Sequence, residues 1–175
     1  MRPLVFLAFL LLINNVEAGE RLGFKEFLLG DSLSALTSGQ RDNCVPDVQG
    51  PDTQQCTLTG YTIANQRIYG LTLSYYKNKL YEIYIWIKPN EYDVAMLALV
   101  HKYGPGKRAE SIVQNNFGVK FKQTEWNWDL GRYGIQSERY KDSVDESFIY
   151  FIDNKISDEQ FRSSHGQIKS PDEDL

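Results

Sequence analysis

The chain has 175 residues, and its 23 acidic side chains outnumber its 19 lysines and arginines, so the net charge is −4. Such a chain lacks the excess of basic groups with which proteins hold nucleic-acid phosphates, so nucleic acid is not an expected partner. The length suits one domain with a single core, because domains usually have about 100 to 150 residues.

Residues 1–18 have the pattern of a secretory signal peptide. Arg2 gives a positive charge, Leu4 to Ile13 carry no polar side chain, and Val16-Glu17-Ala18 offers small residues to signal peptidase. A short buried helix or an uncleaved anchor is the alternative, but an apolar run this short spans about half of a bilayer core. We expect cleavage after Ala18 and export to the periplasm or beyond, with no membrane span left in the mature chain.

The mature chain is expected to form one domain over residues 19–164, followed by a flexible acidic tail over residues 165–175. The tail is rich in Gly, Ser, Pro and acidic residues, which do not build a core. Near the start of the domain, Ser32 to Leu36 fit a short helix that Asp31 or Ser32 can cap. The polar residues 37–51 are interrupted by Gly and Pro, and this composition predicts a loop.

The chain has two cysteines, Cys44 and Cys56, and both lie in a polar segment. In an oxidising compartment such a pair is expected to form a disulfide, which would stabilise the domain by roughly 3 kcal/mol. A catalytic thiol and half of a metal site are the alternatives, but the neighbouring residues do not supply the partners that either needs. The chain also lacks Asn-x-Ser/Thr glycosylation sites, which favours a bacterial periplasm.

Residues 67–88 have the clearest strand pattern, with two runs of alternating apolar and polar side chains on either side of Lys77-Asn78-Lys79. An odd-numbered loop lets both apolar sets share one face, so we expect a hairpin with a three-residue loop over 77–79. The pairs expected to face inward are Tyr75–Tyr81, Leu73–Ile83 and Leu71–Ile85. The residues expected to face outward are Ser74, Tyr76, Glu82, Tyr84 and Trp86, with Trp86 opposite Gly70.

A helix is expected next, because Asn90 can cap it, apolar residues recur at helical spacing up to Tyr103, and Gly104-Pro105 can end it. This helix is expected to pack on the inward face of the hairpin. Residues 111–117 fit either a strand or a short helix, and residues 157–164 fit a last helical turn. Three further strands are predicted over residues 119–128, 133–140 and 147–152.

The order helix, two strands, helix, three strands predicts an α+β fold in which the helices pack on one face of an antiparallel sheet. The string Lys77 to Ile83, the helix ending in Lys102-Tyr103-Gly104-Pro105 and the later Trp-bearing strand resemble small exported bacterial proteins of uncharacterised function. The resemblance covers roughly residues 23–152 and extends loosely to BamE-like and β-lactamase-inhibitor-like domains. It implies a helix-plus-sheet domain and brings no catalytic residues.

The chain offers few residues for catalysis. His101 lies near the end of the predicted helix and His165 lies in the predicted tail, and no Ser stands in a G-x-S-x-G turn. Asp142, Asp145 and Glu146 form the densest acidic group, but they lack the spacing and the Gly of a calcium loop. We therefore expect no metal and no cofactor, whereas a pair of carboxylates that meets only in the fold stays open.

The outward aromatic residues Tyr76, Tyr84 and Trp86 form a candidate binding patch, because Tyr and Trp dominate the energetics of protein interfaces. Burial under another part of the chain is the alternative. The sequence therefore favours a non-enzymatic exported binding domain, such as an inhibitor, an immunity-type protein or an envelope accessory factor, with another extracytoplasmic protein as its partner. The other two hypotheses are a carboxylate-based hydrolase of cell-wall or sugar substrates and a structural component of the envelope.

Overall fold

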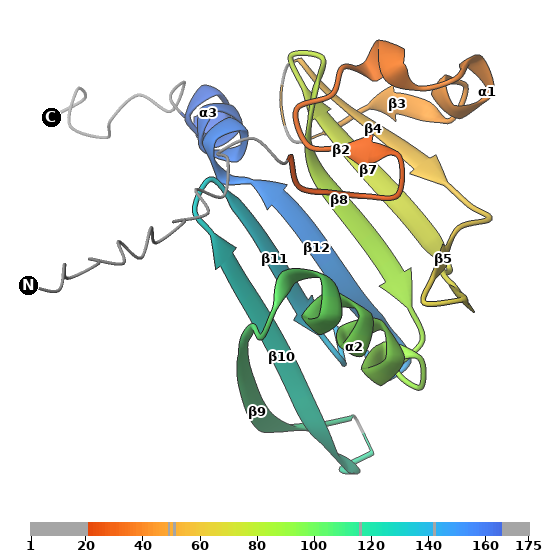
Figure 1. Cartoon of the computed structure of the whole chain (residues 1–175), viewed down its shortest axis with the longest axis vertical. Coiled ribbons are helices and arrows are strands. Elements are labelled where there is room, and N and C mark those ends of the chain that lie inside the picture. The colour runs from red at the N-terminus through yellow and green to blue at the C-terminus, as the bar shows by residue number, and fades with distance from the viewer. Residues whose placement is uncertain (1–20, 49, 51, 116, 142, 166–175) are drawn as a thin grey trace, which may run out of the picture.

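The computed structural model describes residues 21–165, except residues 49, 51, 116 and 142 (Figure 1). The expected signal peptide and the expected tail beyond residue 165 lie outside the described residues. Two pairs of short strands accompany the main sheet: β1 (Gly23–Phe24) with β2 (Phe27–Leu28), and β5 (Thr62–Ile63) with β6 (Gln66–Arg67). The helices are a 3₁₀ turn (Leu33–Ala35), α1 (Ser38–Arg41), α2 (Tyr92–Tyr103) and α3 (Asn154–His165).

The centre of the fold is an eight-stranded sheet in which every neighbouring pair is antiparallel. In spatial order its strands are β3 (Cys44–Pro46), β4 (Thr53–Leu58), β7 (Gly70–Tyr76), β8 (Lys79–Ile87), β12 (Ser147–Asp153), β11 (Tyr133–Glu138), β10 (Lys120–Leu130) and β9 (Lys107–Gln114). The last strand, β12, therefore lies beside β8, in the middle of the sheet. This long-range pairing joins the two halves of the chain.

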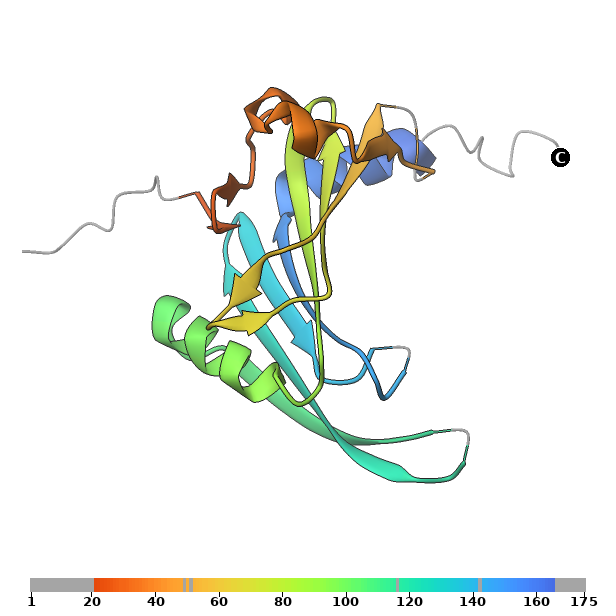
Figure 2. The same ribbon diagram turned by 90° about the vertical axis from the view of Figure 1, so that its right-hand side faces the viewer.

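The expected α+β arrangement, with helices on one face of the sheet, is wrong. The described structure is mostly β, and the strands before and after α2 belong to one continuous sheet. Figure 2 shows α2 on one side of this sheet and α3 on the other. The error has a physical cause: residues 44–46, 53–58 and 107–114 form strands although their sequences are largely polar, because pairing with a neighbouring strand satisfies their backbone groups.

The hairpin of β7 and β8 keeps most of its expected register. The structure confirms Leu71 opposite Ile85, Leu73 opposite Ile83 and Gly70 opposite Trp86. The three-residue loop and the Tyr75–Tyr81 pair are wrong, because Tyr76 pairs with Lys79 and Tyr75 pairs with Leu80.

A two-residue turn closes this hairpin. Lys77 and Asn78 both have a positive φ, of 46° and 64°, which is the backbone of a type I′ turn. An even-numbered loop alone would send one apolar set outward. A register shift at Ser74/Tyr75 makes Tyr81 an extra residue in β8, and this bulge returns Ile83 and Ile85 to the inward face.

The inward face of the sheet holds the main core, in which Leu71, Ile83 and Ile149 are completely buried. Helix α2 packs on this face through one side. The Tyr92 hydroxyl lies 3.0 Å from Thr124 O, to which it donates, and 2.9 Å from Ser137 Oγ. The helix thus lies over β10 and β11, and Gly104, with a φ of 76°, ends it as expected.

Helix α3 covers one end of the opposite face. Its Ile156 is buried against Tyr76 and Tyr81, which form a small cluster of their own, apart from the main core. Arg132 fixes the beginning of the helix, because its guanidinium donates to both carboxylate oxygens of the buried Asp153, with Nε at 3.1 and 3.0 Å. Helix α3 therefore does not cover the rest of the opposite face.

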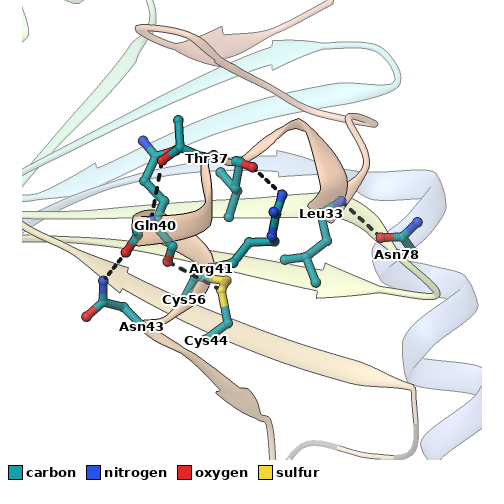
Figure 3. Close-up of a disulfide and its surroundings, with 10 residues drawn as sticks. Leu33, Thr37, Gln40, Arg41, Asn43, Cys44, Cys56 and Asn78 are labelled. Carbon is teal, nitrogen blue, oxygen red and sulfur yellow. Dashed lines mark hydrogen bonds between the residues drawn. A yellow bond between two sulfur atoms is a disulfide. The ribbon is translucent and has the colours of Figure 1, made fainter.

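The disulfide between Cys44 and Cys56 is confirmed, and it joins directly opposite residues of β3 and β4 (Figure 3). Helix α1 lies beside it and is held by a capping box, in which Thr37 and Gln40 exchange hydrogen bonds. Cys56 is completely buried, so the cross-link ties the edge strand β3 to the core. Across the described residues, no helix has the length and apolar content that crossing a bilayer requires.

Candidate functional site

Side chains alternate between the two faces of a strand, so the residues between the core positions share the second face of the sheet. We call this second face, beyond α3, the open face. The strand registers place its residues in three rows that cross β7, β8, β12, β11 and β10 in that order. The rows are Gly70, Trp86, Phe148, Glu138, Glu125; then Thr72, Tyr84, Tyr150, Gln136, Asn127; then Ser74, Glu82, Ile152, Gly134, Asp129.

Four aromatic rings gather on β8 and β12 in the middle of the open face, and we call Tyr84, Trp86, Phe148 and Tyr150 the aromatic cluster. Tyr84 lies at its centre, with ring centroids 4.6 Å from Trp86, 5.2 Å from Phe148 and 6.2 Å from Tyr150. The Tyr84 and Phe148 rings are stacked, with an interplanar angle of 8°. Phe148 is buried, while the other three are half-buried and present ring surface to solvent.

The structure separates the three residues of the predicted binding patch. Tyr84 and Trp86 belong to the aromatic cluster, as neighbours on one face of β8. Tyr76 is only 2% exposed, because Ile156 of α3 packs against it. Whether Tyr84 and Trp86 bind a partner stays a prediction.

Sequence reasoning missed Phe148 and Tyr150 as members of this surface. The register places Phe148 opposite Trp86 and Tyr150 opposite Tyr84. The alternation of residues 147–152 predicts a strand and puts these two rings on the same side of it, but it does not say which strand lies next to it. The missing signal is the pairing of β8 with β12.

A largely buried carboxyl group lies beside the aromatic cluster. Burial raises the pKa of Glu82 to about 7, and the nearby Asp47 adds to this effect, while a hydrogen bond from Tyr150 opposes it. The Tyr150 hydroxyl lies 3.4 Å from Glu82 Oε2, which is a long contact. On the neighbouring strand Ser74 is opposite Glu82, and its buried Oγ has no hydrogen-bond partner in the described part of the chain.

The β10–β11 half of the open face carries carboxylates and amides instead of rings. Glu125 and Glu138 are directly opposite each other and line a shallow pocket of about 240 Å³, together with Gln136 and Lys107. Lys141 lies between this half and the rings, with Nζ 5.2 Å from the Phe148 ring centroid and 4.0 Å from Glu138 Oε1. The open face therefore changes from aromatic to acidic across β12 and β11.

A second pocket, of about 400 Å³, adjoins the aromatic cluster at Trp86. Its lining residues are Tyr69, Gly70, Trp86, Asp145 and Glu146. The indole lies over Gly70, where an added Cβ would be in ordinary van der Waals contact with Trp86 Cδ1, at 3.6 Å. This pocket brings two carboxylates of the β11–β12 loop next to an indole.

Nucleophilic and metal chemistry find little support in the described residues. Both cysteines are in the disulfide, and Asp142 of the predicted acidic group lies outside the described residues. Ser74 and Lys77 have an S-x-x-K spacing that sequence reasoning missed, but Ser74 is buried within β7 whereas Lys77 lies in the turn after this strand, with Nζ 5.0 Å from the ring centroid of Tyr76. Among the residues placed by the structure, no three His, Cys, Asp or Glu side chains come together as metal ligands.

The geometry of the open face is thus the main guide to what this chain does. A scan of the chain against protein-family models found no match, and neither did searches of curated proteins and of solved structures. The resemblance to BamE-like and β-lactamase-inhibitor-like domains therefore remains a prediction.

Proposed function

We propose that this chain is an exported binding domain that recognises another extracytoplasmic protein through the aromatic cluster on its open face. The observation that carries the proposal is the arrangement of Tyr84, Trp86 and Tyr150, three half-buried rings held in place around one another and around Phe148. Rigid aromatic side chains lose little conformational entropy when they bind, and they supply large contact areas. The Cys44–Cys56 disulfide supports an oxidising compartment.

Packing within the chain is the competing explanation for exposed rings. Aromatic side chains favour strands for packing reasons alone, and half-buried rings are common on sheets. A binding role explains a further feature, which packing alone does not: Trp86 lines one surface pocket, and Glu138, opposite Phe148, lines another, so apolar and polar contacts lie side by side. Interfaces have this composition, with aromatic anchors surrounded by a polar rim.

The test compares capture of a partner by the mature chain and by two alanine variants. Trp86→Ala removes a ring of the aromatic cluster, and Leu97→Ala removes a side chain that is 69% exposed on α2, on the other side of the sheet. A protein captured from extracytoplasmic extract is identified, purified and titrated against all three. We expect Trp86→Ala to weaken binding by about 2 kcal/mol or more, and Leu97→Ala to leave it unchanged. Equal affinities, or no reproducible partner, would contradict the proposal.

A carboxylate-based hydrolase is the second candidate, and the opposition of Glu125 and Glu138 in one pocket favours it. Glycosidases place two carboxyl groups across the bond that they cleave. Glu82, whose raised pKa would suit a general acid, is not among the residues that line this pocket. Release of reducing ends from cell-wall material by the wild type, and its loss in Glu138→Gln, would support this candidate; no release by the wild type would exclude these substrates.

A further inference from the structure

The pocket at Trp86 has the composition of a site for a cationic side chain. It combines the indole of Trp86 with the carboxylates of Asp145 and Glu146 in a space of about 400 Å³. A guanidinium or ammonium group is attracted by an aromatic face and by a carboxylate, and both kinds of surface meet here. We propose, building on the protein-binding function above, that the partner inserts a lysine or arginine side chain into this pocket.

The side-chain carboxylates and the indole N–H of the pocket form no ion pair or hydrogen bond within the described part of the chain. In the part of the chain that the structure describes, neither Asp145 nor Glu146 forms an ion pair, and both residues are exposed. The indole N–H of Trp86 has no hydrogen-bond partner there, whereas that of Trp128 donates to Gly104 O at 2.8 Å. A ligand can therefore reach these groups without displacing an internal contact.

Two cations of the chain already lie against rings on either side of Trp86. Lys88 Nζ is 5.3 Å from the ring centroid of Tyr69, which also lines the pocket, and Lys141 Nζ is 5.2 Å from that of Phe148. No cation of the described residues lies over Trp86 in the same way. The ring of Trp86 is therefore available to a cation from outside.

The charge of the surrounding surface favours the same kind of partner. The open face and the pocket carry the carboxylates of Glu125, Asp129, Glu138, Asp145 and Glu146, against the three lysines Lys88, Lys107 and Lys141. Acidic groups in this excess attract basic proteins and speed their association. The pocket also continues into the aromatic cluster, which offers more apolar surface than a small free amine can cover. These two features favour a basic protein segment as the occupant.

The experiment follows the indole N–H resonance of Trp86 by NMR in the mature chain, with Trp86→Phe for its assignment. N-acetyl-arginine amide is the probe, and N-acetyl-citrulline amide, which has nearly the same shape without the charge, is its control. We expect a saturable shift of the Trp86 signal with the arginine probe alone. The signal of Trp128 should not move, because this ring is buried on the inward face of the sheet.

Asp145→Asn with Glu146→Gln should weaken binding of the arginine probe by about tenfold or more, because charge-assisted contacts are lost. Asp158→Asn with Glu159→Gln on α3 makes the same change of charge at exposed positions elsewhere, and binding should stay unchanged. No saturable shift, an equal response to the citrulline probe, or undiminished binding after both pocket carboxylates are replaced would overturn the inference. A protein partner that depends on Trp86 but not on the two carboxylates would overturn it too, and would leave the binding function standing.

Discussion

Replacing Glu82 by Gln tests the buried polar group of the open face. In the folded chain burial raises the pKa of Glu82 to about 7, whereas the ordinary value, which the unfolded chain approaches, is 4.5. Between these two pH values the folded state retains a proton that the unfolded state has released. The free energy of unfolding must therefore fall as the pH rises from 4.5 to 7, and this contribution is constant on either side of that range.

The size of the effect follows from the same two pKa values. The gap between about 7 and 4.5 corresponds to roughly 3 kcal/mol of unfolding free energy at neutral pH. Gln has nearly the same shape as protonated Glu, stays neutral at every pH, and keeps an oxygen that can accept from the Tyr150 hydroxyl. We expect Glu82→Gln to match the wild type near pH 4 and to be more stable by roughly 3 kcal/mol near pH 8.

Urea unfolding of both proteins at several values between pH 4 and pH 8, with the disulfide intact, measures this difference. Glu125→Gln is the matched control, because Glu125 belongs to the same face but is exposed, and its substitution should show no comparable trend. A stability difference between Glu82→Gln and the wild type that stays constant from pH 4 to pH 8 would refute the reasoning. It would mean that Glu82 is as well solvated in the folded chain as in the unfolded one.

The other predictions concern packing and cross-links, and denaturant unfolding measures each. Ile85→Ala should cost roughly 2 to 5 kcal/mol, because Ile85 is completely buried and the change leaves a cavity. Trp86→Ala should lower the free energy of unfolding by less than Ile85→Ala does. An equal loss in the two variants would show that the open face is covered. Cys44→Ser should cost roughly 2 to 4 kcal/mol and expose a Cys56 thiol that alkylating reagents do not find in the wild type. Tyr92→Phe should cost about 0.5 to 1.5 kcal/mol, because it removes the hydrogen bonds of a buried hydroxyl, and an unchanged midpoint would contradict this.

Local patterns in the sequence predict several elements correctly. The alternation in residues 79–87 puts Ile83 and Ile85 inward and Tyr84 and Trp86 outward, because successive side chains of a strand must point to opposite faces. Gly104 ends α2 because glycine adopts a positive φ without a steric penalty. The disulfide is predictable because the chain has a single pair of cysteines.

The hairpin shows where a local pattern stops being sufficient. Both apolar sets had to share one face, and the sequence predicted that an odd-numbered loop would achieve it. The chain uses a two-residue turn with a bulge at Tyr81 instead. Ile83 therefore faces inward as predicted, whereas Tyr81 does not. Two solutions satisfy the same pattern of side chains, and the packing of Tyr81 against Ile156 of α3 distinguishes them.

The candidate site depends on contacts between residues that are far apart in the sequence. The sequence alone determined that Tyr84 and Trp86 share one side of a strand, and that Phe148 and Tyr150 share one side of another. Only the tertiary structure decided that β8 and β12 are neighbours, with Trp86 opposite Phe148. The physical reason is that any strand of matching alternation can pair with any other, so the choice depends on how the whole sheet buries its core.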